Sequence, residues 1–146
     1  MQHSASTGYA LLALRLSLAL FMLMWAVFKV TTPASYGSSD GGAGIFGSFY
    51  GVSLGQSVVY AVGLAQIVFL LAFAVGIAKF ITTGGVMLMN LATLAVSLPS
   101  ISTSLGGDGN LLFAASFPVF GASLALFLMR DHDTVLSYGR PGSTGG

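Results

Sequence analysis

Two consecutive stretches decide the fold: SVVYAVGLAQIVFLLAFAVGIA, from Ser57 to Ala78, and FITTGGVMLMNLATLAVSLPSI, from Phe80 to Ile101. Lys79 separates them, and neither stretch contains a charged residue. A bilayer core about 30 Å thick is crossed by a helix of about 20 residues, because each residue adds about 1.5 Å. In hydrocarbon every backbone N–H and C=O must find a partner within its own segment, which favours helices. The two stretches therefore predict a pair of transmembrane helices.

The composition also indicates a membrane protein and excludes several kinds of site. Of the 146 residues, 55% are hydrophobic and 6% are charged, whereas soluble domains are about 25% charged. The chain has no cysteine, which excludes disulfides, thiolate nucleophiles and thiolate-bound iron–sulfur clusters. Its net charge of +1 provides no basic surface for nucleic acid, so we expect no nucleic-acid partner.

Two further apolar runs flank this pair. The first covers residues 9–30 and contains Arg15. It is longer than the apolar region of a secretory signal peptide, about 7–15 residues, so we interpret it as a transmembrane helix. The last run covers residues 110–130, and Pro118 inside it is expected to kink the helix.

The predicted fold class is therefore all-α, an integral membrane four-helix bundle forming one domain over residues 1–146. A polar, glycine-rich segment at 131–146 is interpreted as a flexible tail. The transmembrane helices are expected near residues 9–30, 57–78, 80–104 and 110–130.

The long connection between the first two helices, residues 31–56, leaves two alternatives open. Ile45, Phe46, Phe49 and Tyr50 have the spacing of one face of a short helix lying flat in the membrane interface. The seven glycines of the connection favour an irregular loop with a few packed aromatic side chains instead.

The distribution of basic residues predicts the orientation. An even number of helices places both termini on one side of the membrane, together with Lys79, Arg130, Arg140 and the early Arg15. Lys29 lies toward the other side. The positive-inside rule then predicts cytoplasmic termini in a bacterial-type inner (plasma) membrane.

Three polar residues within the spans are candidate ligand-binding residues: Arg15, Gln66 and Asn90. Counted from the terminal side, they lie roughly 9, 18 and 15 Å deep, so they could form a ladder of polar groups that binds the head of a quinone or a lipid. The alternative is structural. Arg15 then extends to the headgroups, and the two amides hold helices together.

Other candidates for chemistry receive structural interpretations. Trp25 and Lys29 have the positions of an aromatic-belt anchor and of a lysine that reaches the interface. His132 between Asp131 and Asp133 resembles a metal-binding cluster, but a single histidine on a flexible tail is more typical of a solvated boundary. We expect no catalytic residue, because no nucleophile–base set can be assembled. We also expect no metal site and no bound cofactor.

A resemblance to a known family rests on three features. An arginine lies near the start of the first helix, WAVFK (Trp25 to Lys29) ends it, and VGLAQIVFLLAFAVGIAKF (Val62 to Phe80) forms most of the second. In these features the chain, over roughly Ala10 to Leu128, resembles the DoxX-like family of four-helix integral membrane proteins, which includes the small subunit of a thiosulfate:quinone oxidoreductase. The resemblance implies a four-helix bundle, cytoplasmic termini and association with membrane redox systems.

Two functional hypotheses follow. The first is a non-catalytic accessory or scaffold subunit of a larger membrane complex, expected to be of the respiratory or another redox kind. It would dock other integral membrane subunits through Gly121 and Ala125 on the fourth helix. The alternative is a quinone-binding subunit of a membrane oxidoreductase, with its site near Arg15, Gln66 and Asn90. Both hypotheses place the chain in the lipid bilayer, and neither makes it an enzyme on its own.

Overall fold

The protein is helical throughout the part that the structure describes. The computed structural model describes residues 5–38, 42–105, 107 and 111–138, and no β-strand is found among them. Within these residues, three helices are long and apolar enough to cross a membrane. They are α1 (Ala5–Thr31), α4 (Gln56–Val75) and α5 (Lys79–Leu105). The predicted all-α fold with apolar helices of membrane-spanning length is thus confirmed.

The turn between α4 and α5 has a clear local cause. Gly76 adopts a left-handed conformation, with φ of 74°, and its N–H bonds to the carbonyl of Phe73 at 3.0 Å. Glycine occupies this position at the end of many helices because it has no Cβ to oppose a positive φ. The turn lies at the predicted break, although α4 ends at Val75 rather than at residue 78.

The fourth apolar run does not form one kinked helix. A 3₁₀ segment, η1 (Leu111–Ala115), leads into α6 (Ser116–Leu128). Pro118 therefore lies in the first turn of α6, where a missing N–H costs no intrahelical hydrogen bond. Pro118 marks the beginning of a helix, so the expected kink is wrong. The predicted first residue of this span, 110, lies outside the described residues.

The connection after α1 contains two short helices, α2 (Pro33–Tyr36) and α3 (Gly44–Tyr50). The residues proposed for a short amphipathic helix thus lie in a short helix. Gly44 begins α3 with φ of 62°, and a Cβ there would lie 2.3 Å from the carbonyl oxygen of Gly37. Glycine is therefore required at this close approach of the two segments. The placement of α3 in a membrane interface stays a prediction.

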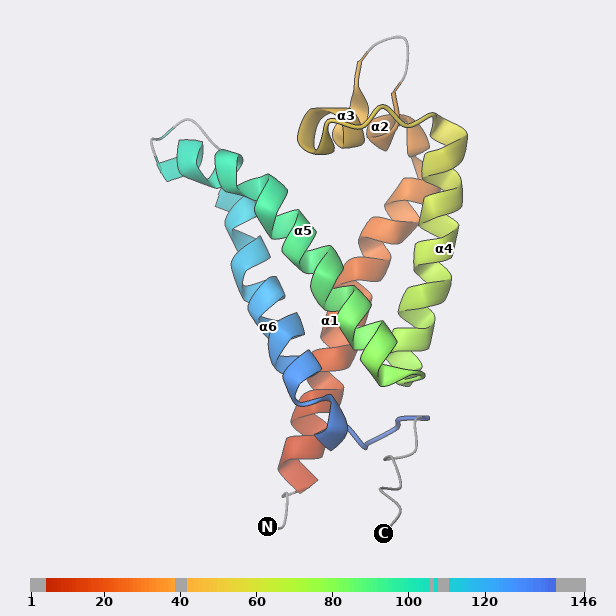
Figure 1. Ribbon diagram of the computed structural model, residues 1–146, viewed down its shortest axis with the longest axis vertical. Helices are drawn as coiled ribbons and strands as arrows, with labels where there is room; N and C mark the ends of the chain where they lie inside the picture. Colours follow the sequence, from red (N-terminus) through yellow and green to blue (C-terminus); the bar gives the residue numbers. More distant parts are fainter. Residues whose placement is uncertain (1–4, 39–41, 106, 108–110, 139–146) are drawn as a thin grey trace.

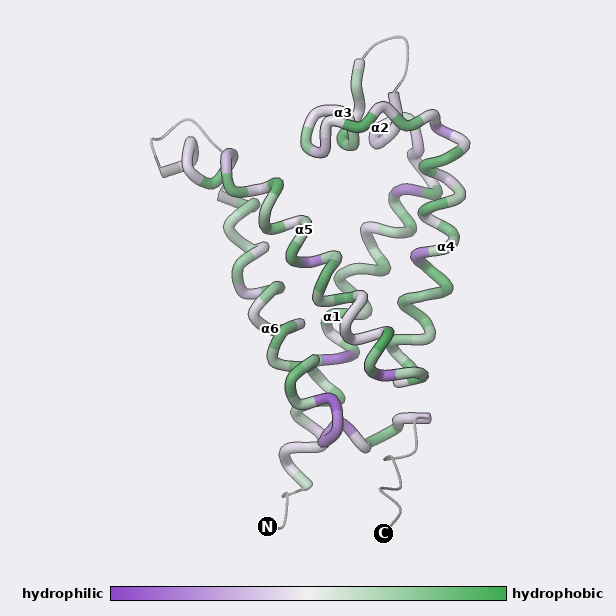
Figure 2. Tube along the Cα trace, in the orientation of Figure 1, coloured by the Kyte–Doolittle hydropathy of each residue, from purple (hydrophilic) through white to green (hydrophobic). Residues whose placement is uncertain are grey.

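The long helices are arranged as two pairs (Figure 1). α1 packs along α4, and α5 packs along α6; the pairs meet near η2 (Arg130–His132) and diverge toward α2 and α3. Figure 2 shows hydrophobic residues along α4 and α6 and hydrophilic residues gathered at η2. The buried apolar core lies where the pairs meet. Its fully buried members include Ala26, Leu70, Phe73, Val86 and Leu126.

Candidate functional site

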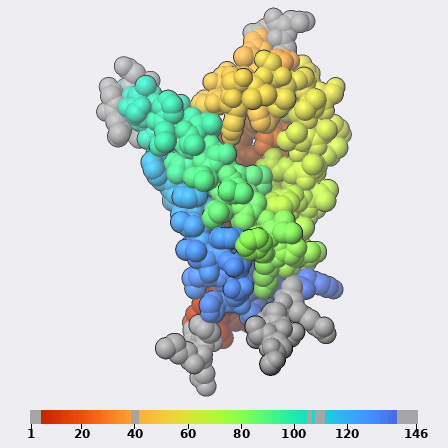
Figure 3. Space-filling model, in the orientation of Figure 1, coloured from red at the N-terminus to blue at the C-terminus, as the bar shows by residue number. Residues whose placement is uncertain are grey.

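A cavity of about 490 Å³ lies between the two helix pairs, on the side of α2 and α3. In Figure 3 the surface is hollowed between α5 and α4, below α3. This volume falls in the range of pockets that bind one small molecule, about 300–1,000 Å³. Aromatic side chains make up much of the wall: Phe21, Trp25, Tyr36, Phe46, Phe49, Tyr50 and Phe113.

Two of the three predicted ligand-binding residues line this cavity. Gln66 reaches it from α4 and Asn90 from α5. Asn90 is 5% exposed, and Gln66 is half-buried, so both amides face the interior of the bundle as predicted. The structure therefore brings together two residues that lie on consecutive helices and at similar depths.

Lys29 also lines this cavity, which corrects the prediction that its side chain reaches the membrane interface. Its Nζ donates to Oε1 of Gln66 at 2.8 Å and lies 5.4 Å from the centre of the Tyr36 ring. The side chain is half-buried and lines the cavity beside Trp25. Lys29 thus points into the protein instead of extending to an interface. Counting residues places Lys29 near the far end of its span and Gln66 near the middle of the next, so no sequence signal indicated this contact.

The two amide groups have weak partners on their donor side. Nε2 of Gln66 lies 3.8 Å from Sδ of Met89, and Nδ2 of Asn90 lies 3.6 Å from Sδ of Met22. A thioether sulfur is a weak hydrogen-bond acceptor. Both amides therefore keep most of their capacity to donate to another molecule in the cavity.

Tyr36 adds a fourth polar group to the same cavity. It is 4% exposed, and its hydroxyl has no hydrogen-bond partner among the described residues. Burial, with a smaller contribution in the same direction from the neighbouring Tyr50, raises the pKa of Tyr36 to about 12. The hydroxyl consequently stays protonated at neutral pH and can donate a hydrogen bond.

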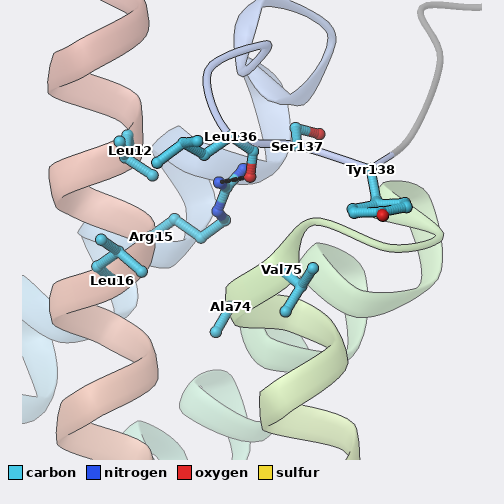
Figure 4. Close-up of a pocket in the computed structure, with 8 residues that line it drawn as sticks. All are labelled: Leu12, Arg15, Leu16, Ala74, Val75, Leu136, Ser137 and Tyr138. Atoms are coloured by element: carbon cyan, nitrogen blue, oxygen red, sulfur yellow. Dashed lines mark hydrogen bonds between the residues drawn. The ribbon is translucent and has the colours of Figure 1, made fainter.

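Arg15 does not belong to this cavity, which corrects the predicted ladder of three polar groups. The side chain is 1% exposed, and Nη1 donates to Oδ2 of Asp133 at 2.5 Å in a buried ion pair. Nη2 donates to the carbonyls of Val135, at 3.1 Å, and Leu136, at 2.9 Å. Figure 4 shows the guanidinium extending from α1 to the chain after η2. Arg15 faces the protein interior, one of the two placements predicted for it, and its role is to hold the C-terminal segment.

The segment that contains Asp133 is packed against the bundle, so the interpretation of residues 131–138 as a flexible tail is wrong. Asp133 is 0% exposed, and Nζ of Lys79 donates to its backbone carbonyl. Farther along, the N–H of Tyr138 donates to the carbonyl of Val75 at 3.2 Å. The remainder of the predicted tail, 139–146, lies outside the described residues. One of the two aspartates beside His132 is therefore an internal structural group.

The face predicted to dock other subunits lies elsewhere, on α6. Gly121 and Ala125 are both exposed, and a Cβ added at Gly121 would meet no atom of the described residues within 4 Å. This face is accordingly not packed against the other described helices of the bundle.

Comparison with family models, with curated proteins and with solved structures finds no match to this chain. The cavity, the buried ion pair and the exposed α6 face are therefore the features of the molecule that bear on its function.

Proposed function

We propose that the chain is an integral membrane protein that binds an elongated amphipathic molecule, of the quinone or lipid kind, in the cavity between its helix pairs. The observation that carries the proposal is the convergence of Lys29, Gln66 and Asn90 on one cavity of about 490 Å³ with aromatic walls. Pockets that combine apolar walls with a few oriented polar groups are typical of small-molecule sites. In this proposal the chain binds and positions its ligand and has no catalytic activity of its own.

The proposal includes four membrane spans. The η1 segment and α6 follow one another, and together they are roughly 30 Å long at 2.0 and 1.5 Å per residue. That length matches the hydrocarbon core of a bilayer. Arg15, Lys79 and Arg130 lie toward the end where the pairs meet, which supports placing that end, with both termini, on the cytoplasmic side of an inner membrane.

The polar groups suit a ligand whose head accepts hydrogen bonds. The ammonium of Lys29 and the amide N–H groups of Gln66 and Asn90 are all donors. A quinone carbonyl or a lipid head group accepts such bonds, while its apolar tail would lie along the aromatic wall. Together with the resemblance to the DoxX-like family, this supports a binding subunit associated with a membrane redox system.

The first prediction tests occupancy by filling the cavity. Ala92 lines it and carries no polar group, so Ala92→Phe is expected to abolish saturable ligand binding by occupying the volume. Trp25 is the only tryptophan of the chain and also lines the cavity, so its fluorescence reports on binding. Purified protein in nanodiscs would be titrated with a short-chain quinone and with a brominated single-chain lipid, both of which quench tryptophan.

The control for this titration is Ala61→Phe, which adds the same ring at an exposed position of α4 outside the cavity. It should bind as the unchanged protein does. Quenching that rises linearly without saturation in every variant would mean that Trp25 is meeting quencher in the bulk lipid, and the cavity would have no ligand.

A second candidate function is favoured by the exposed face of α6. Here the chain is an accessory or scaffold subunit, and another membrane subunit packs on Gly121 and Ala125. Small residues let two helices approach closely and gain dispersion energy, which is the usual basis of helix association in lipid.

The second prediction addresses that face. Gly121→Leu is expected to release any partner that co-purifies in mild detergent, because the added side chain holds the two helices apart. The bundle itself should remain folded with an unchanged melting temperature, since none of the described residues has an atom within 4 Å of the new Cβ. The same set of co-purifying proteins before and after the substitution would exclude Gly121 from the interface.

A further inference from the structure

The polar side of the cavity carries a positive charge that no carboxylate of the described chain neutralises. Nζ of Lys29 has three hydrogens to donate, and its hydrogen bond goes to a neutral amide oxygen, Oε1 of Gln66. The acidic residues within the described part of the chain are Asp131 and Asp133, and both lie near the opposite end of α1. Asp133 is already paired with Arg15. Within the described residues, the charge on Lys29 therefore faces the cavity without an anionic partner.

Several hydrogen-bond donors around Lys29 have weak partners, or none among the described residues. Both amide N–H groups have sulfur atoms as their acceptors, and the hydroxyl of Tyr36 has none among the described residues. On the acceptor side, Oε1 of Gln66 is engaged by Lys29. A half-buried cation among hydrogen-bond donors that lack strong acceptors is stabilised by a negatively charged group that only accepts hydrogen bonds.

We propose that the cavity selects amphiphiles with an anionic head group, a carboxylate or a phosphate, over neutral amphiphiles such as quinones. This inference rests on the proposed function, because it requires that the cavity holds a ligand at all. The head would accept hydrogen bonds from Lys29, Gln66 and Asn90, and an acyl chain would lie along the aromatic wall. Fatty acids and singly acylated phospholipids share this chemistry.

The test compares head groups on one identical chain. Unchanged protein in nanodiscs at pH 8, well above the ordinary pKa of a carboxyl group, would be titrated with 9,10-dibromostearate and with its methyl ester, and quenching of Trp25 recorded. We expect the carboxylate to bind roughly tenfold more tightly than the ester, since one charge-assisted hydrogen bond accounts for a difference of that size. A dibrominated lysophosphatidate should also bind more tightly than the ester. The anion that binds more tightly identifies whether the preferred head group is a carboxylate or a phosphate.

Three variants assign the preference to Lys29. Lys29→Gln is expected to bind carboxylate and ester equally, and Lys29→Arg to retain the preference because it keeps the charge. Lys79→Gln removes a positive charge at the other end of the bundle, where Lys79 bonds to Asp133. This variant should keep the preference for the carboxylate. Loss of the preference in Lys79→Gln as well would attribute the effect to overall charge and overturn the inference.

The remaining outcomes separate this inference from the proposed function. Saturable quenching of equal strength by carboxylate and ester in the unchanged protein would show a ligand cavity without anion selectivity, and the inference would fail alone. Absence of saturable quenching by all three amphiphiles and by the short-chain quinone would overturn both the anion preference and the proposed binding function.

Discussion

Asp133→Asn is expected to lower the free energy of unfolding by about 3–5 kcal/mol, the usual cost of removing one partner of a buried ion pair. The substitution keeps the size of the side chain but leaves the guanidinium of Arg15, 1% exposed, without a counter-charge. The loss should appear as a lower melting temperature of the purified protein in detergent. The end of the chain after η2 should also become sensitive to protease, because the ion pair and the two carbonyl bonds of Arg15 hold it.

Asp131→Asn is the matched control, since Asp131 is exposed two residues earlier. It should change the melting temperature little. The double substitution Arg15→Met with Asp133→Leu is expected to recover much of the lost stability, because well-packed apolar side chains often replace a buried ion pair at little cost. Equal melting temperatures for Asp131→Asn and Asp133→Asn would show that the ion pair does not stabilise the fold.

The second large effect is expected from Gly63→Leu. Gly63 is buried where α1 and α4 pack together, and a Cβ there would lie 2.9 Å from Cγ2 of Val30 and 3.1 Å from Cβ of Lys29. A leucine would therefore force the two helices apart, at a cost of about 1–3 kcal/mol for overpacking. Because Gly63 lies one turn before Gln66, the same displacement should separate Lys29 from Gln66 and weaken ligand binding.

Gly121→Leu serves as the matched control for this effect, because it introduces the same side chain into open space. Melting temperature and quenching of Trp25 should be measured for both variants. A Gly63→Leu protein with the stability and the binding of the control would show that the close approach of α1 and α4 is not required.

The helices were predictable because two physical constraints act on the sequence alone. An uncharged run such as 57–78 must satisfy its backbone hydrogen bonds internally in lipid, which requires a helix. Its length also matches the thickness of the bilayer core. The break near Lys79 was predicted from that charge, whereas the end of α4 at Val75, where Gly76 caps the helix, lies three residues before the predicted end at 78. The beginning of α6 was not predictable in the same way, because Pro118 is compatible both with a kink and with the first turn of a helix.

The candidate site was predictable only in part, for a reason that depends on rotation about the helix axes. Counting residues gave the depths of Gln66 and Asn90, and both do line one cavity. Depth does not determine which way a side chain points. Arg15 points to the chain after η2, and Lys29 points inward to Gln66, because packing of the helices fixes their rotation. Asp133 was not predicted as the partner of Arg15, because it lies in a polar segment with the composition of a flexible tail.

The ion pair between Arg15 and Asp133 also bears on the order in which the protein is made. The two residues are 118 positions apart in the chain, and synthesis proceeds from the N-terminus. Arg15 therefore emerges from the ribosome, and α1 enters the bilayer, well before Asp133 exists. During that interval the charge must remain in contact with water or lipid headgroups, because a buried, unpaired guanidinium is costly. The final position of α1 thus becomes favourable only once residue 133 has been translated, so completion of the fold is coupled to near-completion of the chain.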